Sequence, residues 1–236
     1  MRKDIHNSDV PRLCVSCEAR HRGICGALNP EELVTLARHT SKARHEPGRQ
    51  LIGETDEISS YANVMRGVVK LSKMLEDGRQ QVVGLQFAPD FMGRPFAESS
   101  AVTAEAASEV ETCSFPKSAL ETLISQNPDL EHRLLQQTLK ELDEARDWML
   151  TLGRKTAAEK VASFLYLIAT HLEPEDIVST SFTLPVTRAD IADFLGLTIE
   201  TVSRQITKLR AENVIEIVAN RQVTIPDLKK LHHRCG

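Results

Sequence analysis

Apolar and polar positions alternate with a period of two in the middle of the chain. Between about residues 48 and 116, runs such as "YANVMRGVVKLSKML" and "RQQVVGLQFA" are separated by Gly, Pro and Asp residues. Period 2 places successive side chains on opposite faces of a strand. Asp77-Gly78 separates two of these runs, as in a hairpin turn. The region is predicted to form a small antiparallel β barrel or roll.

Apolar spacing becomes helical on both sides of this region. In "NPEELVTLARHT", Asn29 can cap a short helix, Pro30 suits the first helical position and Glu32 can reach back to the cap. After the strands, helix is predicted over 117–152, with Gly153 ending it, and then over 154–172. The segment "EPEDIVSTSF" that follows is expected to be a polar connection.

The long helix carries one stripe of mainly apolar residues at steps of three and four. Its members are Leu135, Thr138, Leu142, Ala145, Met149 and Leu152. This spacing is typical of a dimer seam between two helices, and it also fits a wide core-facing stripe in a monomer. Acidic residues surround the stripe, and like charges across a two-fold axis would weaken association.

The sequence from 186 to 225 has the pattern of a helix-turn-helix followed by a hairpin, or wing. Thr187 and Thr198 can cap two helices, and Gly196 can make the turn between them. The residues expected to face inward are Ile191, Ala192, Leu195, Leu197, Val202, Ile206 and Leu209. "VIEIV" and "RQVTI", around Ala219-Asn220, predict the wing. An unrelated pair of antiparallel helices would show the same apolar residues.

The outer face of the second helix has side chains suited to reading DNA bases. Glu200, Ser203 and Arg204 lie at i, i+3 and i+4 and project together. Arg can donate two hydrogen bonds to guanine, Glu can accept one from cytosine, and Ser can do either. The residues that suit phosphate contacts are Thr198, Thr201, Gln205, Lys208 and Arg221. The other interpretation is an ordinary solvated face.

Composition adds limits to this picture. The chain of 236 residues is 41% hydrophobic and 26% charged, with a net charge of −4, but residues 199–236 hold seven Lys and Arg against four Asp and Glu, or +3. No apolar run is long enough to cross a membrane, and the N-terminus has no secretory pattern. The expected location is therefore a reducing cytoplasm, where clustered cysteines bind metals more often than they form disulfides.

Three cysteines, Cys14, Cys17 and Cys25, lie within twelve positions of one another. A tetrahedral metal or a cluster requires a fourth ligand, and soft thiolates suit both zinc and iron–sulfur centres. A zinc site and a redox disulfide between Cys14 and Cys17 therefore remain open at this point. Cys235, the penultimate residue, is expected to be a free and mobile thiol.

A barrel, a long helix and a winged helix-turn-helix in this order resemble the cyclic AMP receptor protein (Crp/Fnr) family. "LGLTIETVSRQITKLR" is similar to the recognition region of the FNR branch, named for fumarate and nitrate reduction, whose Glu-x-x-Ser-Arg is matched by Glu200, Ser203 and Arg204. The resemblance implies an α+β fold with a cysteine loop and a cupin-like β roll of the cyclic-nucleotide-binding type. The expected domains are a cluster-binding loop, a sensor roll, a dimerisation helix and a DNA-binding domain, at 1–28, 29–116, 117–153 and 154–236.

The resemblance also implies a cofactor. Regulators of the FNR branch hold an oxygen-labile [4Fe–4S] cluster, and the four ligands matched here are Cys14, Cys17, Cys25 and Cys113. The spacing Cys-x2-Cys-x7-Cys resembles that of α-proteobacterial members. By the same analogy, Ile24 would shield the cluster from oxygen.

The function implied is that of an oxygen-sensing transcription regulator and not an enzyme. The cluster-loaded homodimer would bind TTGAT-like palindromic DNA without oxygen and recruit RNA polymerase. Cyclic nucleotide is not expected as a ligand, because "GRPFAESSAVTAEA" lacks the Arg-Ser pair that would hold its phosphate. The alternatives are a zinc-binding or clusterless constitutive regulator and an iron–sulfur redox protein. The last lacks a Gly-rich phosphate loop and leaves the winged helix unexplained.

Overall fold

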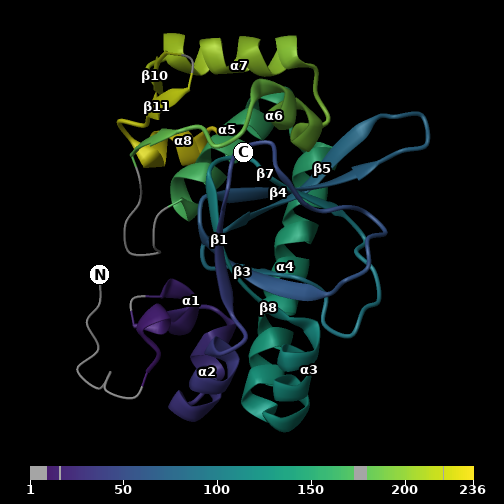
Figure 1. Cartoon of the computed structure of the whole chain (residues 1–236). Coiled ribbons are helices and arrows are strands. Elements are labelled where there is room, and N and C mark those ends of the chain that lie inside the picture. The colour runs from purple at the N-terminus through teal and green to yellow at the C-terminus, as the bar shows by residue number, and fades with distance from the viewer. Residues whose placement is uncertain (1–9, 16, 173–179, 220) are drawn as a thin grey trace. The chain divides into compact units, whose positions relative to one another are not determined.

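The computed structural model describes residues 10–15, 17–172, 180–219 and 221–236 (Figure 1). The chain divides into two compact units. Residues 1–73 with 85–142 form the first, and residues 74–84 with 143–236 form the second. No helix in the described ranges is long and apolar enough to cross a membrane.

Short helices precede the roll. The cysteine segment, expected to be a loop, contains three helical turns: η1 (Arg12–Cys14), α1 (Glu18–His21) and η2 (Ile24–Ala27). Helix α2 (Pro30–Ala37) follows, and its predicted capping box is confirmed. The Asn29 side chain accepts from the Glu32 N–H, and the Glu32 carboxylate accepts from the Asn29 N–H.

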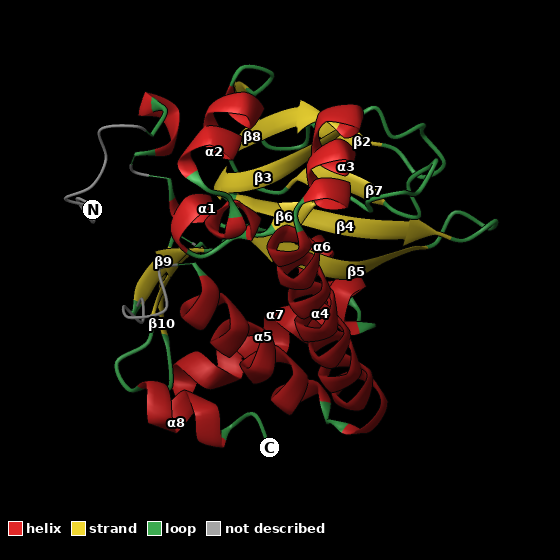
Figure 2. Cartoon of the chain, turned by 90° about the horizontal axis from the view of Figure 1, so that it is seen from below, coloured by secondary structure: helices red, strands yellow, loops and turns green. Residues whose placement is uncertain are grey.

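The β roll is built from two four-stranded antiparallel sheets, which confirms the predicted fold (Figure 2). One sheet has the order β1-β8-β3-β6 and the other β2-β7-β4-β5. The strands are β1 (Ser41–His45), β2 (Gln50–Ile52), β3 (Ser60–Arg66), β4 (Val68–Met74), β5 (Gln80–Phe87), β6 (Phe91–Met92), β7 (Thr103–Ala106) and β8 (Val110–Pro116). Strands begin at Ser41, earlier than the alternating pattern indicated.

A core on one side of the β1-β8-β3-β6 sheet joins the cysteine segment to the roll. It combines buried residues of the segment, such as Ile24 and Cys25, with Tyr61, Phe91 and Phe115 of the strands. Leu120 and Leu130 of the following helices pack in the same core. The cysteine segment is therefore part of the hydrophobic core of the first unit and not an appendage to it.

Three helices follow the roll: α3 (Lys117–Gln126), α4 (Pro128–Arg154) and α5 (Ala157–His171). The predicted long helix is confirmed, and it ends at Arg154, one residue beyond Gly153. Helix α5 begins after Thr156, whose side chain forms a capping box with Glu159.

The C-terminal part is a winged helix-turn-helix, as predicted (Figure 1). It contains α6 (Arg188–Leu195), α7 (Ile199–Ala211), β10 (Glu216–Val218), β11 (Gln222–Thr224) and α8 (Leu228–His233). The supposed polar connection ends in a further strand, β9 (Ser181–Thr183), which pairs with β11. Asn220, at the predicted wing turn, lies outside the described residues.

Cys235 is a free thiol, as expected, but the expectation that it is mobile was wrong. Its side chain is buried at 7% exposure, and its Sγ lies 3.4 Å from the Leu231 carbonyl oxygen. Burial also raises the pKa of this thiol. Cys235 is thus a packed residue of the C-terminal helices, close to α5 through a contact between its carbonyl and the Ser163 hydroxyl.

Candidate DNA-binding and cysteine sites

The geometry of α6 and α7 is fixed by caps, a turn and burial. Thr187 caps α6 in a capping box with Asp190, and Thr198 accepts from the Thr201 N–H at the start of α7. Gly196 has φ +61°, the left-handed conformation that favours glycine at a helix end. The inward residues predicted on the two helices are buried, including Ile191, Leu195, Val202, Ile206 and Leu209, whereas Leu197 in the turn is half-buried.

The opposite face of α7 presents the three predicted base readers to solvent. Glu200, Ser203 and Arg204 are all exposed. The pKa of Glu200 is held below its usual value by hydrogen bonds from its own backbone N–H and from Thr198. Glu200 is therefore a carboxylate at neutral pH, as acceptance from a cytosine amino group requires. Arg204 Nη2 lies 3.4 Å from Thr201 Oγ1, a long contact that DNA could replace.

The predicted phosphate-contacting residues surround that face. Thr198, Lys208 and Arg221 are exposed, while Thr201 and Gln205 are half-buried. The Lys208 ammonium lies 4.0 Å from the Glu212 carboxylate, a weak ion pair at a solvated position. The side chains available to DNA thus come from the N-terminal cap, the helix face and the wing.

The four predicted cysteine ligands lie within electrostatic range of one another. Cys17 and Cys25 are buried, and Cys14 and Cys113 are half-buried. Burial and the neighbouring Cys17, Cys113 and Cys14 raise the pKa of Cys25 to about 12, against the effect of a hydrogen bond from Asn63. Burial, Cys17 and Cys14 likewise raise the pKa of Cys113 to about 11. Four thiolates here would repel one another, and a cation core would offset this repulsion.

Strand pairing explains how Cys113 reaches the other three. In the register of the sheet, Cys113 on β8 lies between Lys42 on β1 and Asn63 on β3. The buried Asn63 donates from Nδ2 to Cys25 Sγ at 3.4 Å. The Lys42 ammonium lies 3.4 Å from the Leu13 carbonyl, next to Cys14. This row of three side chains therefore connects the sheet to both ends of the cysteine segment.

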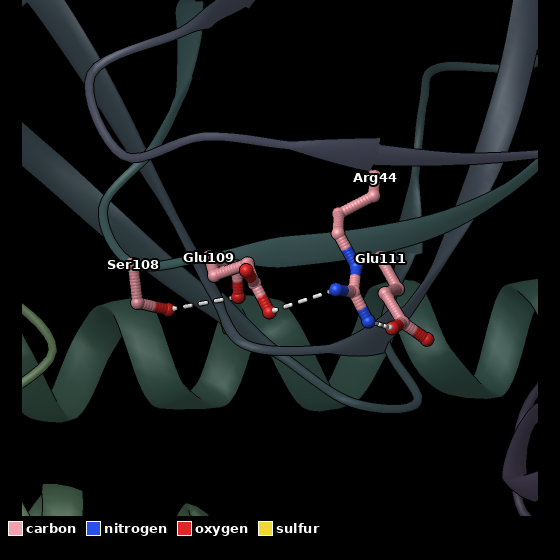
Figure 3. Close-up of polar contacts among 4 residues, drawn as sticks. All are labelled: Arg44, Ser108, Glu109 and Glu111. Carbon is pink, nitrogen blue, oxygen red and sulfur yellow. Dashed lines mark hydrogen bonds and ion pairs between the residues drawn. The ribbon is translucent and has the colours of Figure 1, made fainter.

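An exposed ion pair lies on the edge strand that carries Lys42. Arg44 on β1 lies directly opposite Glu111 on β8, and Arg44 Nη2 lies 2.7 Å from Glu111 Oε1 (Figure 3). Glu109 lies 3.8 Å from the same guanidinium. The hydrogen bond from Arg44 lowers the pKa of Glu111. Lys42 and Arg44 are two residues apart on β1, and their partners on β8, Cys113 and Glu111, are also two residues apart. All four side chains therefore lie on the same face of the sheet.

The fit of these residues to an iron–sulfur cluster rests on the donor set. Soft sulfur ligands, a partly apolar wall and an N–H donor to one sulfur suit such a centre. In the part of the chain that the structure describes, no three His, Cys, Asp or Glu side chains already form a metal-ligand geometry. Ile24 is 1% exposed beside Cys25, a position compatible with the predicted shielding.

Comparison with known proteins identifies the family. The Crp-like helix-turn-helix domain matches residues 159–234, and the cyclic nucleotide-binding domain matches residues 42–127. A Rhizobium leguminosarum bv. viciae protein named "Probable transcriptional activator" is 54% identical, with 98% of this chain and 96% of the relative covered. This chain belongs to the Crp/Fnr family. The family resemblance predicted from the sequence is therefore confirmed.

Two further relatives agree with this family. Transcriptional activator protein FnrL of Cereibacter sphaeroides is 39% identical, with 97% of this chain and 95% of the relative covered. The solved structure of FixK2 from Bradyrhizobium japonicum has a TM-score of 0.76 at 31% identity, with 84% of this chain and 98% of that chain covered. Crp/Fnr proteins are transcription regulators that bind DNA and act as dimers, and this chain is a member.

In this Crp/Fnr regulator, α4 leaves most of its predicted seam exposed. Leu135 and Met149 are 54% and 73% exposed, and Leu142 is 44% exposed. Thr138 and Ala145 are exposed and Leu152 is half-buried. Leu130 and Leu134 instead face the core of the first unit. The helix thus has a core-facing side and a separate apolar stripe open to a partner.

A cavity of about 510 Å³ lies next to the first half of α4. It is lined by Phe91, Gly93, Pro95, Phe96, Ile124, Pro128, Glu131, His132, Leu134, Leu135, Gln137, Thr138 and Glu141. None of these lining residues is Lys or Arg, and two are acidic. A cyclic phosphate in this cavity would find neither an arginine fork nor a lysine ammonium among them.

Proposed function

We propose that this Crp/Fnr regulator is an oxygen-responsive transcription activator that holds a [4Fe–4S] cluster on Cys14, Cys17, Cys25 and Cys113. The observation that carries the proposal is that Cys14 and Cys17 of the N-terminal segment and Cys113 of strand β8 lie close enough to Cys25 to raise its pKa, and that Asn63 of the neighbouring strand donates to the Cys25 sulfur. When bound, the cluster would supply sensitivity to oxygen. Asn63 would donate to one ligand sulfur, and Ile24 would limit access.

A hydrogen bond between the cysteine segment and α4 supports a route from ligand binding to dimerisation. The guanidinium of Arg133, on α4, donates to the Arg22 carbonyl oxygen. Arg22 lies between Cys17 and Cys25, so its backbone would be held in place when both cysteines bind iron. Arg133 precedes the seam residue Leu135 by less than one turn. Ordering of the segment would thereby favour one position of the helix at its seam.

The DNA target follows from the recognition helix and from the family. The proposed homodimer reads a palindrome of TTGAT-like half-sites through Glu200, Ser203 and Arg204. Its two recognition helices would enter major grooves about one DNA turn apart. In the cytoplasm the bound dimer would recruit RNA polymerase. Cyclic nucleotide is not proposed as a ligand, because the residues that line the cavity described above include no Lys or Arg to pair with its phosphate.

Anaerobic purification tests the cofactor. The cluster-loaded protein is expected to be brown, to lose its visible absorption in air, and to contain iron and sulfide in equal amounts. A colourless protein with stoichiometric zinc would favour the zinc-binding regulator, and one without metal would favour the clusterless regulator.

Single Ser replacements test the ligands. Cys113→Ser is expected to abolish retention of the cluster, as are the same changes at Cys14, Cys17 and Cys25. Cys235→Ser is the matched control, since Cys235 is a buried free thiol whose contacts, with Leu231 of α8 and Ser163 of α5, lie in the second unit. A full cluster in Cys113→Ser would contradict the assignment of the fourth ligand.

A further inference from the structure

The exposed stripe of α4 has a negatively charged residue on one side and a positively charged residue on the other. With Leu135, Leu142 and Met149 at the a positions of a heptad, Glu141 occupies a g position and Arg146 the following e position. The other g and e positions along the stripe hold Leu134, Leu139, Trp148 and Gly153. One acidic and one basic residue are thus the charged pair that borders the seam.

We propose that Glu141 of each subunit pairs with Arg146 of the partner subunit across a parallel two-stranded coiled coil of α4 helices. The inference rests on the proposed dimer seam and adds the contact that sets its orientation and register. In parallel coiled coils, a g residue faces the next e residue of the partner, so two-fold symmetry creates this ion pair twice.

The remaining acidic residues near the stripe do not face the partner in this arrangement. Asp143, Glu144 and Asp147 occupy the b, c and f positions on the outer side of the helix. The charges closest to the two-fold axis therefore attract each other, contrary to the repulsion that the acidic composition suggested.

Within α4, Arg146 and Glu141 both make contacts at the exposed surface of the helix. Arg146 Nη1 lies 3.0 Å from Asp143 Oδ1, but the two side chains are 64% and 74% exposed. Glu141 accepts from Gln137 Nε2 at 3.2 Å, also on the exposed surface. Exposed pairs of this kind contribute little, so an interhelical pair over the apolar seam can replace them.

The charge pattern favours the parallel over the antiparallel orientation. An antiparallel coiled coil would bring g positions against g and e against e, which gives Glu141 no basic partner and Arg146 no acidic one. A parallel pair also places both recognition domains at the same end of the two helices, as two half-sites of a palindrome require.

Charge reversal in full-length protein tests the pairing. Glu141→Arg and Arg146→Glu each turn both attractive pairs into repulsive ones, and each variant alone is expected to raise the dimer dissociation constant about tenfold. A mixture of the two variants restores both opposite-sign pairs in the heterodimer. Sedimentation of the mixture should therefore show dimers again. Mass spectrometry of the same mixture, with one variant isotopically labelled, should show heterodimers in excess over either homodimer.

The control carries the same charge changes on the outer side of α4. Asp147 and Lys140 occupy f positions, on the side of α4 away from the seam. The variants Asp147→Arg and Lys140→Glu, alone or mixed, should therefore dimerise like the wild type. If the wild-type protein dimerises but the mixture of Glu141→Arg and Arg146→Glu shows no preference for heterodimers, the ion pair is overturned and the dimer is not. A wild-type protein that stays monomeric even with palindromic DNA would overturn the proposed dimer as well.

Discussion

At the residue scale, the side chains proposed to read DNA and the side chains that pack the helix into its core are separate sets on α7. Val202, Ile206 and Leu209 of α7 are buried, whereas Ser203 and Arg204 are exposed. Substitutions on the exposed face should therefore change DNA binding without a comparable change in the free energy of unfolding.

Arg204→Ala is expected to weaken binding to the palindrome by about 1–3 kcal/mol, the range for loss of a bidentate contact to guanine. The loss should be confined to DNA that contains this guanine, and titration with half-site variants would measure it. Equal losses on cognate and scrambled DNA would contradict the assignment of Arg204 as a base reader.

Lys208→Ala is the complementary change for a phosphate contact. Binding should weaken by a similar factor on all sequences, and the slope of log K against log salt should decrease by about one per subunit contact. Affinities measured over a salt series would show this. A sequence-dependent loss would instead mean that Lys208 reads a base.

At the element scale, the sequence predicted those elements whose periodicity and caps are local. Thr187, Gly196 and Thr198 predicted the helix-turn-helix, because capping and a left-handed turn depend on adjacent residues. Strand β1 was missed because its sequence "SKARH" is an edge strand with mostly exposed side chains, held by pairing with β8. Strand β9 was missed for the same reason, since it exists through its pairing with β11.

In the cysteine site, too, the sequence predicted some residues and missed those whose positions depend on distant parts of the chain. The sequence indicated the four cysteines, but it contained no signal for Asn63, Lys42 or Arg133, whose positions depend on strand register and on contacts distant along the chain. A polar residue in a strand or on a helix is ordinarily solvated. Only the structure distinguishes these three residues from that ordinary case.

Arg133→Ala tests whether α4 is connected to the cysteine segment by its hydrogen bond to Arg22. The cluster content and spectrum should be unchanged, while dimerisation of the anaerobic protein should weaken by about 1.5–3 kcal/mol, the net contribution of a hydrogen bond with a charged donor. Sedimentation and iron analysis on the same sample would separate the two readouts.

Arg133→Lys is the control, because it retains a cationic donor and should recover part of the dimerisation. Loss of the cluster in Arg133→Ala would mean that Arg133 supports the site itself and does not transmit its state. Unchanged dimerisation would contradict any role in coupling.

At the scale of the whole molecule, we propose that the protein switches between two association states. We expect the seam to associate only weakly, because Thr138 and Ala145 have small side chains that can bury little apolar area between two α4 helices. A modest input from the cysteine segment can therefore shift the monomer–dimer equilibrium. Since DNA binding to a palindrome requires both recognition helices, this shift would appear as a change in affinity for DNA.

Sedimentation of matched anaerobic and air-exposed samples, at low micromolar concentration, would show whether loss of the cluster dissociates the dimer. The anaerobic protein is expected to sediment as a dimer, and exposure to air should shift it towards monomer as the visible absorption disappears. Two samples that both sediment as dimers, differing only in affinity for DNA, would contradict dissociation and indicate rearrangement within a permanent dimer.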